Sequence, residues 1–245
     1  MKLTAKSDVG KTRKNNEDSY YMKIIDENAS IFIVADGLGG HLSGEVASNT
    51  LTKDVSDYIC EKSRWLKNAS DDKIKYVISS AIKYANEDIY NLSLSEPIYN
   101  GMGTTVTLVY RINNKVFYAS VGDSRLYFID SSLTNMKQIT VDDTYVNELL
   151  KTNVINEEEA KNHPQKHMLT KAVGISKNVE VVVNTASFSE GYLLLCTDGM
   201  SNMLTENEVI NIFKSTKFDE VASNIIVRAN ENGGSDNITV IVVKL

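Results

Sequence analysis

The sequence predicts an α+β fold built on antiparallel sheets, and three observations support this class. Short runs rich in β-branched and aromatic residues follow one another at hairpin distances between residues 104 and 130. Apolar residues at helical spacing are confined to a pair of segments before these runs and a pair after them. The regular alternation of strand and helix that accompanies parallel sheets is missing.

The N-terminal half is expected to hold one strand and two helices. The apolar run before Asp36 predicts a strand that ends at this aspartate. Apolar residues recur at helical spacing from Val46 to Ile59 and predict the first helix. A second helix should start after Ser70, a residue type that caps helix N-termini, and both helices should cover a sheet.

The rest of the chain is expected to hold most of the strands. Three runs predict a β-meander over residues 104–112, 115–122 and 124–130. Asn156 with Glu159, and Thr205 with Glu208, have the spacing of capping boxes that start two helices. A last helix is expected around residues 221–226. Further strands are expected at residues 178–185, 192–197 and 237–245.

Bulk properties narrow the possible functions. The chain of 245 residues contains two prolines, no repeat and no linker, so we expect one domain over residues 1–245. A net charge of -6 argues against a nucleic-acid partner. Neither a membrane-spanning apolar run nor a secretion signal is visible, and Cys60 and Cys196 are too few for a disulfide framework. We therefore expect a cytoplasmic protein with no membrane partner.

Aspartates recur where the expected strands end. A turn explains any one of them, but not an acid placed beside glycine again and again. Carboxylates brought together repel and raise one another's pKa unless a cation neutralises them, so the set predicts a metal site. The residues concerned are Asp36 before Gly37, Asp123 after Gly122, Asp198 before Gly199, and Asp236 after the pair Gly233-Gly234, with Glu17-Asp18 added to them.

The sequence excludes a dinucleotide-binding loop and disfavours a zinc site. A dinucleotide loop would need a third glycine where Leu42 stands. Only three histidines occur and the cysteines have no partner at zinc-ligand spacing, so the carboxylates favour Mg²⁺ or Mn²⁺. Two such ions are the usual device for phosphoryl hydrolysis. Arg13, four residues before Glu17, is suited to grip phosphate oxygens.

Seven motifs in this order resemble the metal-dependent protein phosphatases of the protein phosphatase 2C (PP2C, or PPM) family, in particular its bacterial single-domain members. They are "RKNNED", "VADGLGGH", "GMGTTVTLV", "VGDSRLY", "NHPQKHMLTKAVG", "LLLCTDGMSNML" and "GGSDNITVIVV". The resemblance runs from Asp8 to Val243. It implies a four-layer α-β-β-α sandwich with two central antiparallel sheets, and a centre of two Mn²⁺ or Mg²⁺ ions at one end.

The resemblance also assigns the metal ligands. Asp36 would bridge the two ions, and the backbone carbonyl of Gly37 would bind one of them. Asp198 and Asp236 would complete the shell of one ion. Glu17 would serve the other ion, directly or through water.

Neighbouring residues receive supporting roles from the same resemblance. Asp18 would support the metal ligands without itself binding an ion. Asp123 would bind a third, weaker metal shared with Asp198. Asn237 and Ser124 would hold the ligand loops by hydrogen bonds, although a purely structural role for both is an equal alternative.

The activity implied is direct hydrolysis of phosphoserine or phosphothreonine in proteins, by a metal-bridging water or hydroxide and without a phosphoenzyme. Arg13 would bind the phosphate, and Asp36 and Asp198 would be catalytic through the metals. A cysteine nucleophile in Cys-x₅-Arg is excluded, because Leu66 and Asn202 stand where the arginine would be needed.

The sequence departs from the family pattern at two positions. Leu38 stands where larger eukaryotic relatives carry the histidine proposed to protonate the leaving group, which leaves a metal-bound water or His41 as the donor. Asp143 stands where bacterial relatives commonly have histidine. Residues 144–167 correspond to the family's flap, which either contacts and admits substrate or is only a surface connection.

Two other functions compete with the phosphatase. One is a non-catalytic relative that binds phosphoproteins, which would be expected to lose some of the metal carboxylates that are present here. The other is a two-metal nuclease, which the acidic balance disfavours. The resemblance further implies a cognate serine/threonine kinase as partner in signalling, and we expect a monomer.

Overall fold

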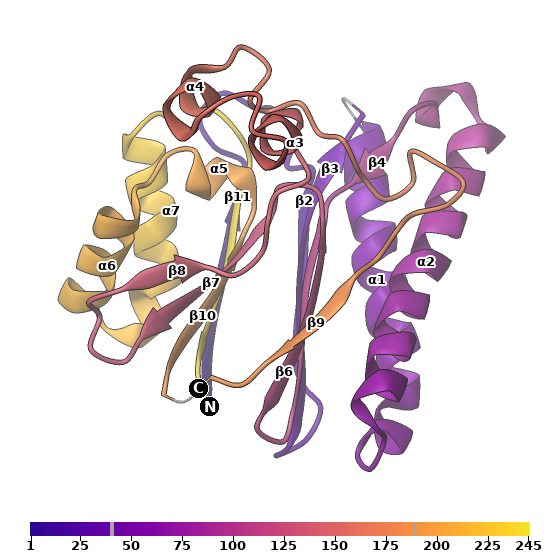
Figure 1. The fold of residues 1–245 in the computed structure, drawn as a ribbon, viewed down its shortest axis with the longest axis horizontal. Helices are drawn as coiled ribbons and strands as arrows, with labels where there is room; N and C mark the ends of the chain where they lie inside the picture. Colours follow the sequence, from indigo (N-terminus) through magenta and orange to yellow (C-terminus); the bar gives the residue numbers. More distant parts are fainter. Residues whose placement is uncertain (40–41, 189) are drawn as a thin grey trace.

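The fold is a sandwich of two antiparallel sheets between two layers of helices (Figure 1). The computed structural model describes residues 1–39, 42–188 and 190–245. The expected α+β class and the four-layer α-β-β-α arrangement are confirmed. His41, one of the two expected proton donors, lies outside the described residues.

Every strand pairing in the described chain is antiparallel. One sheet has the order β1-β11-β10-β7-β8. Its strands are β1 (Lys2–Asp8), β7 (Arg125–Asp130), β8 (Met136–Gln138), β10 (Gly191–Cys196) and β11 (Ile238–Lys244). The other has the order β2-β3-β5-β6-β9, with β4 paired to β3. Its strands are β2 (Asp18–Ile24), β3 (Ala29–Leu38), β4 (Gly103–Thr104), β5 (Val106–Ile112), β6 (Lys115–Val121) and β9 (Val183–Ala186).

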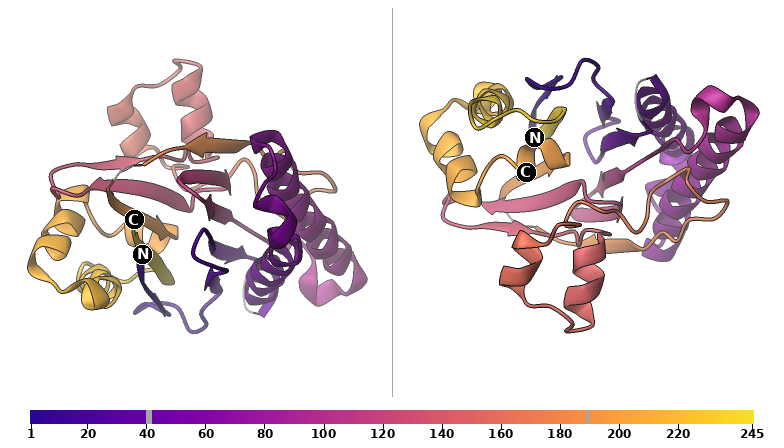
Figure 2. Two further views of the ribbon diagram at one scale, coloured as in Figure 1. Left: turned by 90° about the horizontal axis from the view of Figure 1, so that it is seen from below. Right: turned by 90° about the horizontal axis from the view of Figure 1, so that it is seen from above.

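Helices cover the outer face of each sheet. The long helices α1 (Leu42–Leu66) and α2 (Asp71–Ser95) lie on the sheet of β3, while α6 (Glu206–Ser215) and α7 (Val221–Glu231) lie on the sheet of β11 (Figures 1 and 2). Short helices connect the layers. They are the 3-10 turns Pro97–Tyr99 and Phe218–Glu220 and the helices α3 (Tyr145–Lys151), α4 (Glu157–Asn162) and α5 (Asp198–Ser201). No helix in the described chain is long and apolar enough to cross a membrane.

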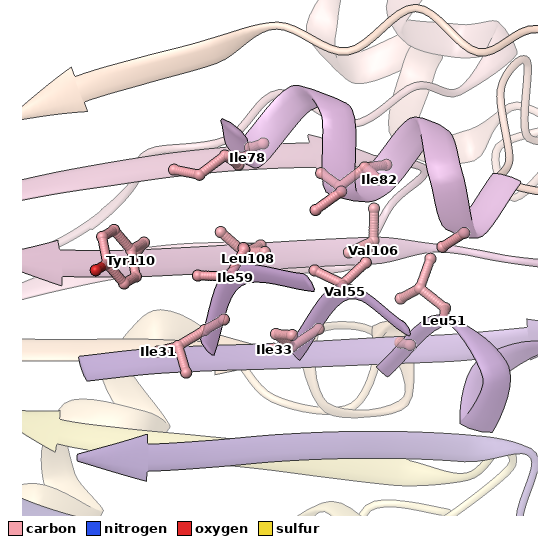
Figure 3. Close-up of a cluster of buried hydrophobic side chains, with 14 of the residues drawn as sticks. Ile31, Ile33, Leu51, Val55, Ile59, Ile78, Ile82, Val106, Leu108 and Tyr110 are labelled. Carbon is pink, nitrogen blue, oxygen red and sulfur yellow. The ribbon is translucent and has the colours of Figure 1, made fainter. Parts of the chain in front are cut away.

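Strand β3 is buried on both faces, which explains why its sequence is apolar without alternation. Ile31 and Ile33 point toward α1 and α2, where Figure 3 shows them with other buried aliphatic side chains. Phe32 and Val34 point the other way, into the core between the two sheets. A strand buried on both faces reads as a continuous apolar run, as this one does.

The expected helix starts are confirmed. The Ser70 hydroxyl accepts a hydrogen bond from the backbone amide of Lys73 at the start of α2. Both capping boxes are formed, by Asn156 with Glu159 at α4 and by Thr205 with Glu208 at α6. The first helix begins earlier than its apolar spacing suggested, at Leu42.

Three expectations about strands need correction. β3 does not end at Asp36, because Gly37 and Leu38 continue the strand by pairing with β4. The meander is broken after β6, because β7 crosses to the other sheet and pairs with β10 and β8. The crossing occurs at Gly122, whose φ of +99° turns the chain in a way that other residues rarely adopt. The strand expected over residues 178–185 forms only at Val183–Ala186.

Candidate metal centre

The acidic residues singled out in the sequence lie at or next to the ends of strands in both sheets. Figure 1 shows the upper ends of these strands beneath α3 and α4. Asp18 opens β2 and faces Asp36 of β3 in the strand register. Asp198 is the first residue of α5, directly after β10. Asp236 lies two residues before β11, and Asp123 lies in the connection between β6 and β7. Two sheets and one short helix therefore deliver five carboxylates to one end of the sandwich.

These carboxyl groups destabilise one another's charged forms. Burial raises the pKa of Asp36 well above its usual value, and the neighbouring Asp18 and Asp198 raise it further. Burial also raises the pKa of Asp18 to about 7, against the opposing hydrogen bonds from Thr239 and Thr197. The pKa of Asp123 rises to about 7 through burial and the charge of Asp198. Ionised together, these groups need a compensating cation.

The cluster has the features expected of a site for divalent cations. Asp18 Oδ1 and Asp198 Oδ1 are buried without a hydrogen-bond partner. Arg13 supplies a positive charge, with its Nη2 2.9 Å from Asp236 Oδ2. Within the described ranges no three His, Cys, Asp or Glu side chains already close around a common point. Carboxylate oxygens are the ligands that Mg²⁺ and Mn²⁺ prefer.

Hydroxyl groups fix the backbone of Asp36. Thr105 Oγ1 accepts a hydrogen bond from the Asp36 amide at 2.9 Å, and Thr104 Oγ1 donates to the Asp36 carbonyl at 2.9 Å. Ser124 Oγ lies 2.6 Å from Thr105 Oγ1, so the loop that carries Asp123 is tied to the same point. Sequence reasoning missed both threonines, although "GMGTTVTLV" was among the quoted motifs.

Asn237 ties the segment before β11 to the connection between β1 and β2. Its side-chain amide donates to the carbonyl oxygens of Val9 and Asn15, both at 2.9 Å, and its oxygen accepts from the Glu17 amide at 2.8 Å. Beneath it, Thr197 Oγ1 donates to Asp18 Oδ2 at 2.8 Å. Asn237 and Ser124 thus make hydrogen bonds between segments around the cluster. Their support of metal ligands stays a prediction.

With the geometry in place, comparison with known proteins identifies the family. The family model for protein phosphatase 2C matches residues 10–239. This chain belongs to the protein phosphatase 2C family. The serine/threonine phosphatase stp of Listeria monocytogenes serotype 4b is 39% identical over 246 residues, covering 100% of this chain and 96% of the relative.

Solved structures of PP2C phosphatases have the same fold as this chain. The serine/threonine phosphatase of S. agalactiae superposes with a TM-score of 0.89 at 31% identity, covering 100% of this chain and 99% of that one. The catalytic domain of the serine/threonine phosphatase PstP, solved in complex with two manganese ions, gives a TM-score of 0.82 at 29% identity, covering 99% and 97%. The expected function is confirmed: the chain is a protein serine/threonine phosphatase rather than a non-catalytic relative.

Two glycines of this PP2C chain are required by close backbone approach. A Cβ at Gly37 would collide with the carbonyl of Gly44 in the first turn of α1, and one at Gly199 would collide with the carbonyl of Asn237. The glycines beside Asp36 and Asp198 therefore let neighbouring loops pack against the acidic cluster. This need is separate from any approach of an ion to the Gly37 carbonyl, which stays a prediction.

We expect Gly37→Ala to lower the free energy of unfolding by about 3 kcal/mol, because backbone atoms must move to admit the methyl group. Urea unfolding measures the loss. Gly101→Ala is the matched control, since no atom lies within 4 Å of its Cβ position and only its φ of +74° opposes the change, at about 1 kcal/mol. Equal losses in the two variants would contradict the steric explanation.

The backbone of Glu17 is tied to the centre of this phosphatase by hydrogen bonds. Its carbonyl accepts hydrogen bonds from the Gly37 amide at 3.1 Å and from Ser48 Oγ at 2.6 Å. Its carboxylate lies against Gly44, where α1 begins. The role of the Glu17 side chain as a metal ligand stays a prediction.

The flap adjoins the cluster. A cavity of about 490 Å³ separates α3 and α4 from the body, and Asp123 and Asp198 lie in its wall. His167, at the end of the flap, lines the same cavity. Seen from above, α3 and α4 project away from the layered body (Figure 2). A substrate segment that enters this cavity would therefore meet both carboxylates.

A buried ion pair that sequence reasoning missed anchors the flap to the phosphatase body. Arg125 of β7 makes three hydrogen bonds of 2.7–3.1 Å to the carboxylate of Asp142, through Nε and Nη2. Asn147 of α3 donates to the Asp142 carbonyl at 2.9 Å. The carboxylate of the next residue, Asp143, accepts a hydrogen bond from the Gly122 amide at 3.2 Å and so holds the loop that carries Asp123.

Removing one partner of this pair should cost stability. We expect Asp142→Ala to lower the free energy of unfolding by about 2–4 kcal/mol, because Arg125 is left mostly buried and uncompensated. Asp57→Ala is the matched control, since its pair with Lys53 is exposed and worth well under about 1 kcal/mol. Urea unfolding of both variants compares them, and a difference below about 1 kcal/mol would refute the structural importance of Asp142.

Proposed function

We propose that this phosphatase depends on two Mn²⁺ or Mg²⁺ ions held by the acidic cluster. The proposed ligands are Glu17, Asp36, Gly37 through its carbonyl, Asp198 and Asp236. The observation that carries the proposal is the cluster of buried carboxylates. Asp18 Oδ1 and Asp198 Oδ1 have no hydrogen-bond partner, and burial raises the pKa values of Asp18, Asp36 and Asp198. Bound ions supply Lewis acidity toward the phosphoryl group and an ionised water for direct attack on phosphorus. The PstP structure with two manganese ions supports this stoichiometry.

The chain's own residues then position the reactants. Asp36 and Asp198 act through the ions. The threonine and serine hydroxyls described above hold Asp36. The Asn202 side-chain amide donates to Asp198 Oδ2 at 3.0 Å. Asp18 stands behind them, fixed by Thr197. A third, weaker ion at Asp123 is supported by the cavity that this residue shares with Asp198.

Arg13 is proposed to bind the substrate phosphate. Its side chain is half exposed and contacts the cluster through an ion pair with Asp236, itself a proposed ligand. A cation bound at Asp236 would compete with the Arg13 guanidinium for this carboxylate. We expect Arg13→Ala to raise KM for a phosphothreonine peptide about tenfold, with Arg13→Lys recovering part of the loss. Lys14→Ala, at the exposed neighbouring residue, is the control. An unchanged KM in Arg13→Ala would exclude phosphate binding by this residue.

The flap is proposed to contact the phosphoprotein and to govern access. The cavity between the flap and the acidic cluster supports this role. Deleting residues 153–162 should reduce turnover of a phosphoprotein more than turnover of a small aryl phosphate, because only the larger substrate reaches the flap. Equal effects on the two substrates would contradict the proposal.

The remaining expectations stay proposals. A single catalytic domain over residues 1–245 is supported by a family match that spans most of the chain. A reducing compartment, the cytoplasm, is supported by the free thiols of Cys60 and Cys196. Action as a monomer opposite a serine/threonine kinase, without nucleic-acid or membrane partners, rests on the resemblance and the acidic charge.

A substrate panel tests the specificity of the reaction. Purified protein with Mn²⁺ should release phosphate from phosphoserine and phosphothreonine peptides, and chelator should stop the release. A phosphotyrosine peptide and a phosphodiester should be poor substrates. Preferential cleavage of the diester, or of DNA, would instead favour the two-metal nuclease.

A further inference from the structure

Helices α1 and α2 carry an exposed groove of aromatic and basic side chains on the surface that faces away from the sheet. The groove has a volume of about 390 Å³. We call it the aromatic groove and define it by Tyr58, Glu61, Lys62, Trp65, Lys73 and Tyr76. Its residues come from the last third of α1 and the first turns of α2.

Large aromatic side chains are left in water here. Trp65, the only tryptophan of the chain, is 81% exposed, and Tyr76 is 65% exposed. The buried faces of α1 and α2 already hold these helices on the sheet through aliphatic residues, so the fold does not need the exposed rings. Exposed apolar patches around a concavity mark interaction sites, and Trp and Tyr are the side chains that contribute most to them.

The charge of the groove indicates what it binds. Lys62 Nζ lies 3.5 Å from the centroid of the Tyr58 ring, and Lys73 Nζ lies 5.2 Å from that of Tyr76. Over the described residues neither ammonium forms an ion pair with a carboxylate. The charged residues that line the groove are two lysines and one glutamate, so the lining is net positive in a chain whose net charge is -6. The groove is therefore a basic region on an acidic protein.

Charge complementarity selects one occupant. A second copy of the chain would place lysines against lysines across a two-fold axis, which is unfavourable. A flat anionic membrane would not fill a concave groove between two helices. An acidic peptide segment with a phenylalanine or leucine matches both features, because the apolar side chain fills the groove while carboxylates meet Lys62 and Lys73.

The groove lies far from the acidic cluster. The turn between α1 and α2 is at the bottom of Figure 1, and the flap is at the top. Helix α1, with 25 residues, spans about 37 Å, and its N-terminal Gly44 contacts Glu17 beside the cluster. A segment bound in the groove would leave the active site free, and about ten extended residues would bridge the separation.

We propose that the aromatic groove docks an acidic, phenylalanine- or leucine-containing segment of phosphoprotein substrates. The identity of the occupant as a substrate rests on the proposed function. Docking raises the local concentration of the phosphorylated residue at the distant site, and so lowers KM without a change in the chemical step.

Binding is tested first without catalysis, because Trp65 is the only tryptophan and its emission reports on the groove directly. The probe is a short tryptophan-free peptide of aspartate, glutamate and phenylalanine. We expect a saturable shift of the emission to shorter wavelength that weakens with salt. Lys62→Glu/Lys73→Glu should abolish the shift, and Lys214→Glu, at an exposed lysine of α6, should retain it.

Other occupants are distinguished in the same assay. A peptide with lysine in place of the acids, and vesicles of phosphatidylglycerol, should give no shift. A response to the vesicles alone would assign the groove to membranes, and a shift that depends on protein concentration alone would assign it to a second copy. Either of these results, or no response to the acidic peptide, overturns the proposal.

Kinetics then link docking to the reaction. A phosphothreonine peptide joined to the acidic segment by about 20 flexible residues should have a KM at least about tenfold below that of the phosphothreonine peptide alone. The advantage should vanish in Lys62→Glu/Lys73→Glu, while turnover of the unattached peptide stays unchanged. Emission shifts without any phosphate release would refute the proposed function but not the groove. Phosphate release without a docking advantage would refute the docking role.

Discussion

Asp36→Asn is expected to lower phosphate release from a phosphothreonine peptide by about three orders of magnitude, because Lewis-acid stabilisation worth several kcal/mol depends on this residue. Asp36 has a central position in the cluster. Its pKa is raised by burial and by the charges of four neighbours, Asp18, Asp198, Asp123 and Asp236. An amide keeps the size of the carboxylate but removes the charge that would bind a cation. Phosphate release with saturating Mn²⁺ measures the effect.

The same substitution should stabilise the metal-free protein. In chelator the Asp36 carboxylate is disfavoured by its burial and by the charges of its neighbours, so the neutral amide removes an unfavourable interaction. Thermal unfolding in chelator should show a higher midpoint for Asp36→Asn than for the wild type, and no gain on addition of Mn²⁺. Asp219→Asn, at an exposed residue, is the control for both readouts. Retained activity, or a lower midpoint in chelator, would contradict the assignment.

The second large effect is a fall in the stability of the metal-free protein as pH rises, which divalent cations should oppose. Asp18 and Asp123 have a folded-state pKa of about 7 against an ordinary value of 3.8. Between these values the folded protein binds more protons than the unfolded chain, so stability falls as pH rises toward 7. Each pH unit in this window removes about 1.4 kcal/mol for each fully shifted group.

Divalent cations should oppose this loss, because they bind the ionised carboxylates and release protons. In chelator the unfolding midpoint should fall between about pH 5 and pH 8, whereas the rise in midpoint caused by Mn²⁺ should grow over the same range. Thermal unfolding at several pH values, with chelator or with Mn²⁺, measures both trends. A metal-free protein that becomes steadily more stable up to pH 8 would show that these carboxyl groups are not mutually destabilising.

Local signals in the sequence predicted individual elements better than their pairing. Ser70 and the two capping boxes place helix starts because each cap is a contact within a few residues. Strand β7 has the composition of its neighbours β5 and β6, and nothing in its own residues records that it pairs with β10 in the other sheet. Strand β2 was missed because it lies at a sheet edge and exposes Tyr20, Met22 and Ile24 rather than showing a buried pattern.

The acidic centre could be predicted for a similar reason. Aspartate beside glycine at strand ends is visible in the sequence. The order of the motifs that contain these aspartates indicated that they belong to one site. The partners that hold the centre are contacts between distant residues, such as Thr105 with Ser124 and Arg125 with Asp142. Their residue types are ordinary, so only the fold shows which threonine holds Asp36 and which aspartate pairs with Arg125.

The most direct test of the central claim is phosphate release from a phosphothreonine peptide by the purified wild-type protein, with Mn²⁺ and with chelator, beside Asp198→Ala. The account predicts release that requires Mn²⁺ and collapses in the variant, because Asp198 lies in the cluster with a buried carboxylate oxygen that has no other partner. Release that persists in chelator, or in Asp198→Ala with Mn²⁺, would show that hydrolysis does not depend on a metal centre at these carboxylates.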